Sequence, residues 1–86
     1  MTSRDQFSIF NLSGDYISYL IMITEKDFLI YDLFGEQIAF GSYITKEQFS
    51  IYDTNTEYIQ FGRMQNTNRF NIFDLNGEFI LHGIKV

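Results

Sequence analysis

Acidic residues are the side chains of this sequence best suited to chemistry, because they recur at two positions four residues apart. Paired carboxylates can act as general acid and base, or can bind Ca²⁺. The two positions flank a short segment that ends in Gly in three of the four places where it occurs, which is typical of a turn. Solvated carboxyls in a turn lack the burial that raises a pKa for acid catalysis. We therefore expect an acidic rim along one edge of a sheet, and its members are Asp15, Asp32, Glu36, Asp53, Glu57, Asp74 and Glu78.

The first interpretation of these acids is that they only form the turns. The second is that they form a docking rim for a basic protein surface. Calcium would need about six to eight converging oxygens, and therefore cooperation between neighbouring turns. The acids at the opposite ends of the hairpins are balanced by basic residues, so that edge should be nearly neutral. Its charged residues are Asp5, Glu25, Asp27 and Glu47 with Arg4, Lys26, Lys46 and Arg69.

Other catalytic signatures are missing from the sequence. His82 is the single histidine and there is no cysteine, so neither a nucleophile–base pair nor a metal-ligating cluster is visible. The six glycines do not form a phosphate-binding loop. We predict a protein that is not an enzyme, with no catalytic residues, no metal and no cofactor. The net charge of −5 also argues against binding to nucleic acid.

The elements that position the acids come from four copies of one 21-residue unit. The units begin FSIFNLSGDYI, FLIYDLFGEQI, FSIYDTNTEYI and FNIFDLNGEFI. They divide a single domain, residues 1–86, into repeats 6–26, 27–47, 48–68 and 69–86. Three positions keep one residue type in every unit: Phe7, Phe28, Phe49 and Phe70; Ile9, Ile30, Ile51 and Ile72; and Ile17, Ile38, Ile59 and Ile80.

Each unit is a strand, a turn and a second strand, because apolar residues alternate on both sides of an Asp/Asn-x-x-Gly segment. The Asp side chain can accept hydrogen bonds from backbone amides two residues on, and Gly takes a left-handed conformation. The third unit has Thr56 in place of this Gly, so Asn55 or Thr56 must adopt a positive φ. We expect that turn to be looser or longer.

A three-residue loop sets the expected register of each hairpin. It pairs Ile30 with Ile38, and Phe28 with Phe40, on one face of the sheet. A two-residue loop would slip the register and exchange the faces. On the second face the expected pairs are Tyr31–Gln37, Phe10–Tyr16, Tyr52–Tyr58 and Phe73–Phe79.

Four hairpins in series predict an all-β, eight-stranded antiparallel meander that closes, or nearly closes, into a barrel filled by side chains. The alternative is an open sheet or a sandwich that covers its apolar face by dimerising. In either case the second face carries aromatic rings. These rings stabilise the sheet as cross-strand pairs, or form a partner-binding surface, or do both. They are Phe10, Tyr16, Tyr31, Tyr52, Tyr58, Phe73 and Phe79.

The unit FNIFDLNGEFI resembles hairpins of several repeat families. It is similar to the strand-turn-strand segment of NHL-type propeller blades, to MORN-like hairpin repeats, and to strands of tubby-like and LURP-one barrels. The period here is shorter than in those families. The resemblance implies a hairpin scaffold that presents a binding surface.

These features predict a non-catalytic binding protein, namely a protein–protein interaction module or a small inhibitor or adaptor, such as a phage encodes. We expect a protein partner of basic charge and self-association into a homo-oligomer. The alternative function is a small-ligand-binding β protein with an aromatic-lined pocket. No signal peptide or apolar membrane helix is visible, so we expect a cytoplasmic protein that binds neither membrane nor nucleic acid.

Overall fold

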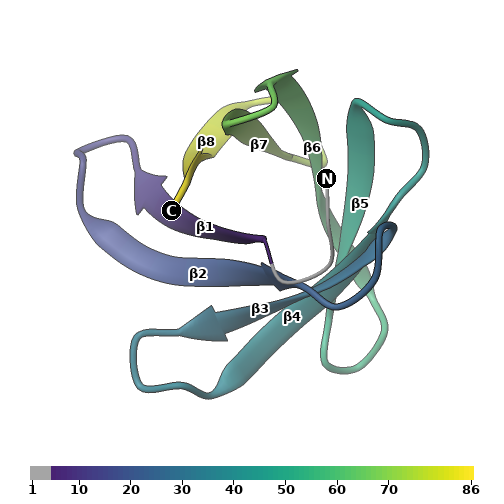
Figure 1. Ribbon diagram of the computed structural model, residues 1–86, viewed down its shortest axis with the longest axis horizontal. Helices are drawn as coiled ribbons and strands as arrows, with labels where there is room; N and C mark the ends of the chain where they lie inside the picture. The colour runs from purple at the N-terminus through teal and green to yellow at the C-terminus, as the bar shows by residue number, and fades with distance from the viewer. Residues whose placement is uncertain (1–4) are drawn as a thin grey trace.

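The computed structural model describes residues 5–86, which form a closed barrel of eight antiparallel strands without a helix (Figure 1). Each strand pairs with the next, and β8 pairs with β1 to close the ring. The predicted all-β meander is confirmed, and the barrel is closed rather than open. The strands are β1 (Gln6–Asn11), β2 (Tyr16–Met22), β3 (Asp27–Asp32), β4 (Gln37–Tyr43), β5 (Gln48–Asp53), β6 (Tyr58–Asn66), β7 (Arg69–Asp74) and β8 (Phe79–Lys85).

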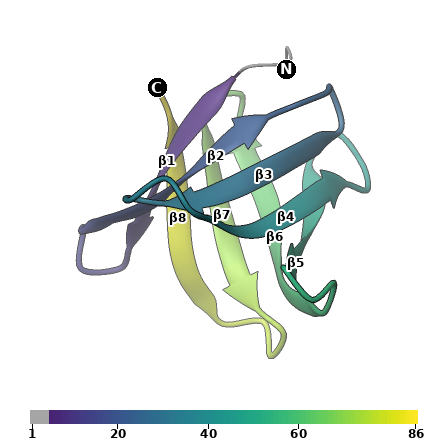
Figure 2. The ribbon, with the colours of Figure 1, turned by 90° about the horizontal axis from the view of Figure 1, so that it is seen from below.

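The meander gives the barrel two different ends. We call one the turn end, because it carries the turns inside the four hairpins, residues 12–15, 33–36, 54–57 and 75–78. We call the other the link end, because it carries the connections between hairpins, residues 23–26, 44–47 and 67–68. In Figure 2 the C-terminus lies at the top and the β5–β6 and β7–β8 turns lie at the bottom. Arg4, expected among the balanced charges of the link end, lies outside the described residues.

The four hairpin turns share one set of backbone hydrogen bonds. In the β7–β8 turn the Gly77 N–H donates to the Asp74 carbonyl at 3.0 Å, and Gly77 has a φ of 83°. In the β5–β6 turn, Thr56 takes the same role, with a φ of 68° and a bond of 3.0 Å to the Asp53 carbonyl. The expected positive φ is therefore confirmed, at Thr56. The expectation of a looser or longer turn is wrong, because Thr56 adopts the left-handed conformation and keeps the hydrogen bond.

A β-bulge in the second strand of every hairpin corrects the predicted register. Tyr31 pairs with Gln37, as expected, but Ile30 pairs with Ala39 and Phe28 with Gly41. The bulge leaves Ile38 without a partner opposite, so the pairs Ile30–Ile38 and Phe28–Phe40 are wrong by one residue. All the expected second-face pairs nearest the turns are confirmed, namely Tyr31–Gln37, Phe10–Tyr16, Tyr52–Tyr58 and Phe73–Phe79.

Four phenylalanines fill the middle of the barrel, each less than 2% exposed. The Phe49 ring lies edge-on between Phe28 and Phe70, with centroid distances of 5.3 Å to both. It faces Gly62 across the hairpin, and a Cβ atom at Gly62 would overlap the ring. Glycine is therefore needed opposite this phenylalanine for steric reasons. The same pairing occurs at Phe28–Gly41 and Phe70–Gly83, whereas the first hairpin pairs Phe7 with Leu20.

Candidate functional site

The acids expected in the rim all lie at the turn end, in or beside the four turns. Their charge is concentrated there: the seven rim carboxylates contribute −7 to a chain total of −5, so all other residues together carry +2. None of the residues from 11–17, 32–38, 53–59 or 74–80 is Lys, Arg or His. The turn end is thus uniformly negative.

The aspartates that begin the turns are bonded to the backbone. The Asp32 side chain accepts hydrogen bonds from the N–H groups of Phe34 at 2.9 Å and Glu36 at 3.0 Å. Asn11 does the same in the first hairpin, so this position needs a side-chain oxygen rather than a charge. The predicted turn chemistry is confirmed by these contacts. The same pair of bonds occurs at Asp53 and Asp74.

Apolar side chains accompany the acids at the turn tips. Leu12, Leu33 and Leu75 are each about half exposed, and Phe34 is 96% exposed. Phe34 occupies the third position of its turn, where the other hairpins carry Ser13, Asn55 and Asn76. Its ring makes almost no contact with the barrel, so its presence does not stabilise the fold. Phe34 was not among the predicted site residues, although a comparison of the four turns shows it as the one bulky residue at an otherwise polar position.

A pocket of about 200 Å³ opens into the barrel at the turn end. Ile9, Ile30 and Ile72 line its inner part. Ile17 and Ile38, the unpaired bulge residues, line its rim and are 37% and 43% exposed. The bulge therefore places a predicted core residue type at the mouth of the barrel instead of in its centre.

The predicted aromatic residues lie on the outside of the barrel wall. They do not gather on one side: they form ring groups at the four seams between neighbouring hairpins. Each seam has one stacked pair with centroids 5.3–5.5 Å apart, namely Tyr19–Tyr31, Phe40–Tyr52, Phe61–Phe73 and His82–Phe10. Tyr16, Tyr58 and Phe79 extend three of these groups towards the turn end.

Four members of the stacks were not among the predicted residues: Tyr19, Phe40, Phe61 and His82. Phe40 was expected in the core, and the bulge between it and the turn moves it to the outer face. A signal was present in the sequence. Tyr16 and Tyr19 are three residues apart, and two residues at this spacing share a face of a strand only if one extra residue lies between them.

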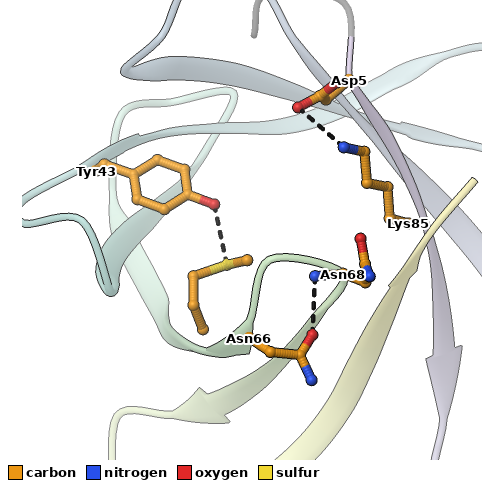
Figure 3. Close-up of polar contacts among 6 residues, drawn as sticks. Asp5, Tyr43, Asn66, Asn68 and Lys85 are labelled. Atoms are coloured by element: carbon orange, nitrogen blue, oxygen red, sulfur yellow. Dashed lines mark hydrogen bonds and ion pairs between the residues drawn. The ribbon is translucent and has the colours of Figure 1, made fainter. Parts of the chain in front are cut away.

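The link end contains a broad depression of about 1120 Å³. Tyr43 is the single aromatic residue among its described lining residues. The Tyr43 hydroxyl donates a hydrogen bond to Met64 Sδ at 3.2 Å, and Asp5 Oδ2 lies 3.6 Å from Lys85 Nζ (Figure 3). Burial raises the pKa of Tyr43 from 10.0 to about 12, and the nearby Asp5 carboxylate adds to this rise. The lining includes three carboxylates and three lysines, so the depression has no excess charge.

Within residues 5–86, no group of three or more His, Asp or Glu side chains is arranged to hold a metal ion. The same residues include no helix with the length and apolar character needed to cross a bilayer. Comparison with family models, curated proteins and solved structures finds no match to this chain.

Proposed function

We propose that this chain is a non-catalytic protein-binding module that docks a basic partner through its turn end. The observation that carries the proposal is Phe34, a 96% exposed ring in a turn that begins at Asp32 and ends at Glu36. Aromatic residues that bury a large area against a partner are frequent hot spots of interfaces. The surrounding negative charge favours a basic surface and speeds its approach.

Side chains must supply the contacts of this interface. Every strand from β1 to β8 is paired on both sides, so a partner cannot extend the sheet by adding a strand. Three of the four turns present apolar tips together with acids, which matches the usual arrangement of an apolar centre and a polar rim. The outer ring stacks contribute less to this proposal, because they are spread around the wall at four seams.

The test compares Phe34→Asn with the wild-type chain as bait. Asn occupies the same turn position in two other hairpins, so the substitution should leave the fold intact. The matched control is Ile44→Asn, which removes a side chain that is 68% exposed at the link end. We expect proteins of basic charge to bind the wild-type chain and the control in low salt. The same proteins should not bind Phe34→Asn.

Calorimetry with a partner identified in this way should show about tenfold or greater weakening for Phe34→Asn. A triple substitution of Glu36, Glu57 and Glu78 to Gln should weaken binding and reduce its salt dependence. The proposal is wrong if Phe34→Asn and Ile44→Asn retain the same set of proteins.

A small-ligand site is the second candidate function, and the depression at the link end favours it. Tyr43, Met64 and the Asp5–Lys85 pair place polar groups together at its surface. Native mass spectrometry of the purified chain should then detect a bound small molecule that Tyr43→Phe releases. A spectrum with the bare chain mass alone would count against this candidate.

Self-association and a cytoplasmic location stay predictions. Light scattering on a size-exclusion column tests the first, and a strict monomer at all concentrations would contradict it. Fractionation of cells that express the tagged chain tests the second.

A further inference from the structure

We propose that the turn-end pocket receives one branched aliphatic side chain of the basic partner; this inference rests on the proposed function. The pocket lies at the centre of the docking surface, where the barrel opens between the four turns. Eight of its ten described lining residues are apolar. A partner that approaches the acidic rim therefore meets an apolar opening in its middle.

The pocket arises from differences between the repeats. One inward-facing position near the turns carries Ser18, Ala39, Gln60 and Leu81 in the four hairpins. Where the last hairpin fills this space with Leu81, the first two have small side chains, each 5% exposed. Ser18 and Ala39 thus leave the volume that the pocket occupies. Four identical repeats with leucine at this position would close it.

The chemistry of the pocket selects its occupant. Its volume of about 200 Å³ exceeds that of a leucine side chain, and its walls offer mainly methyl and methylene groups. The exposed rim, formed in part by Ile17 and Ile38, leaves the opening free. A second copy of the chain would bring another uniformly negative turn end against the first, which charge repulsion opposes. An apolar side chain with basic neighbours meets both the apolar wall and the acidic rim.

Two short labelled peptides serve as probes, each with arginines on both sides of one central residue, which is leucine in the first and serine in the second. Fluorescence anisotropy measures their affinity for the full chain. We expect the leucine peptide to bind about tenfold or more tightly than the serine peptide, because the pocket buries one aliphatic side chain. Both should weaken as salt rises.

Ala39→Leu fills the pocket with the residue that the last hairpin carries at the same position. We expect this variant to keep the thermal stability of the wild type or exceed it, and to bind both peptides equally. Thr67→Leu, at the exposed link end, is the matched control and should keep the preference for leucine. Ser18→Leu provides a second pocket-filling variant if Ala39→Leu alters the far-ultraviolet circular dichroism spectrum.

The outcomes separate the pocket from the docking surface. If the wild type binds both peptides equally and Phe34→Asn weakens both, the pocket inference is overturned and the proposed function stands. If the leucine preference persists in the pocket-filling variants, the side chain binds elsewhere and the inference is also overturned. If neither peptide binds in low salt, both proposals fail.

Discussion

Gly62→Ala should destabilise the barrel, because the new methyl group meets the central Phe49 ring. A Cβ atom on Gly62 would lie 2.8 Å from Phe49 Cε2, and nearer still to Cζ and Cε1. Carbon atoms in contact are about 3.5–4.0 Å apart, so the ring would have to move by roughly 1 Å or more. Phe28 and Phe70 pack against this ring at centroid distances of 5.3 Å, which restricts the movement.

The overlap at Gly62 is severe, so overpacking should cost the upper part of its usual range, about 2–3 kcal/mol, and the lower backbone entropy of unfolded alanine offsets about 1 kcal/mol of it. We therefore expect the free energy of unfolding to fall by about 1–2 kcal/mol. For a domain of this size, Tm should fall by roughly 4–16 °C. Chemical denaturation and calorimetry measure both quantities.

Two further variants locate the effect at the ring. Arg63→Ala changes the next, outward-facing residue and should alter stability by less than about 0.5 kcal/mol. Phe49→Leu shortens the opposing side chain, so the double variant Gly62→Ala/Phe49→Leu should lose clearly less stability than the sum of the single variants. Additive losses, or no loss in Gly62→Ala, would refute the contact between ring and glycine.

Substitutions at three other positions test the turns and the link end. Asp74→Ala removes the acceptor of two backbone N–H groups and should lower the free energy of unfolding by about 1–2 kcal/mol in urea denaturation, whereas Asp74→Asn should lose much less, because Asn11 makes the same bonds. Thr56→Gly relieves the positive φ of 68°, so it should raise the free energy of unfolding by up to about 1 kcal/mol and raise Tm slightly. A lower Tm would contradict this. The Tyr43 pKa of about 12 means that the folded state holds the hydroxyl proton more tightly than the unfolded state does. The free energy of unfolding should therefore fall as the pH rises from 10 towards 12. Denaturation curves of Tyr43→Phe over this pH range should show a smaller fall.

The repeat carried most of the information needed to predict the barrel. Phenylalanine every 21 residues indicated equal hairpins, and equal hairpins in a meander place like residues in layers around one axis. The turn chemistry was equally readable, because Asp32 and Gly35 have local roles that depend on their own backbone segment. Such local features follow from residue type and spacing alone.

The bulge was harder to predict, because most of each strand follows the regular alternation of inward-facing and outward-facing residues. If that alternation continues unbroken through Ile38, it places Phe40 in the core, whereas the bulge at Ile38 turns Phe40 to the outer face. The glycine opposite each central phenylalanine depends on contact between strands. Gly62 and Phe49 are separated in sequence, and the register that pairs them follows only once the bulge is known.

In the candidate site, too, local features could be predicted from the sequence and contacts between strands could not. The rim acids were found from their spacing, whereas the turn-end pocket depends on how Ser18 and Ala39 face Leu81 across a closed barrel. Phe34 was only partly predictable. The sequence shows a bulky residue at a polar turn position, but only the structure shows that its side chain is 96% exposed.

Nuclear magnetic resonance mapping tests most directly whether the turn end is the binding surface. The ¹⁵N-labelled chain is titrated with the arginine-flanked leucine peptide in low salt. We expect amide shift changes to concentrate in residues 12–17, 33–38, 54–59 and 75–80, and to disappear in high salt. Changes confined to the outer wall or to the links at 23–26 and 44–47, or a spectrum unchanged by the peptide, would contradict the account.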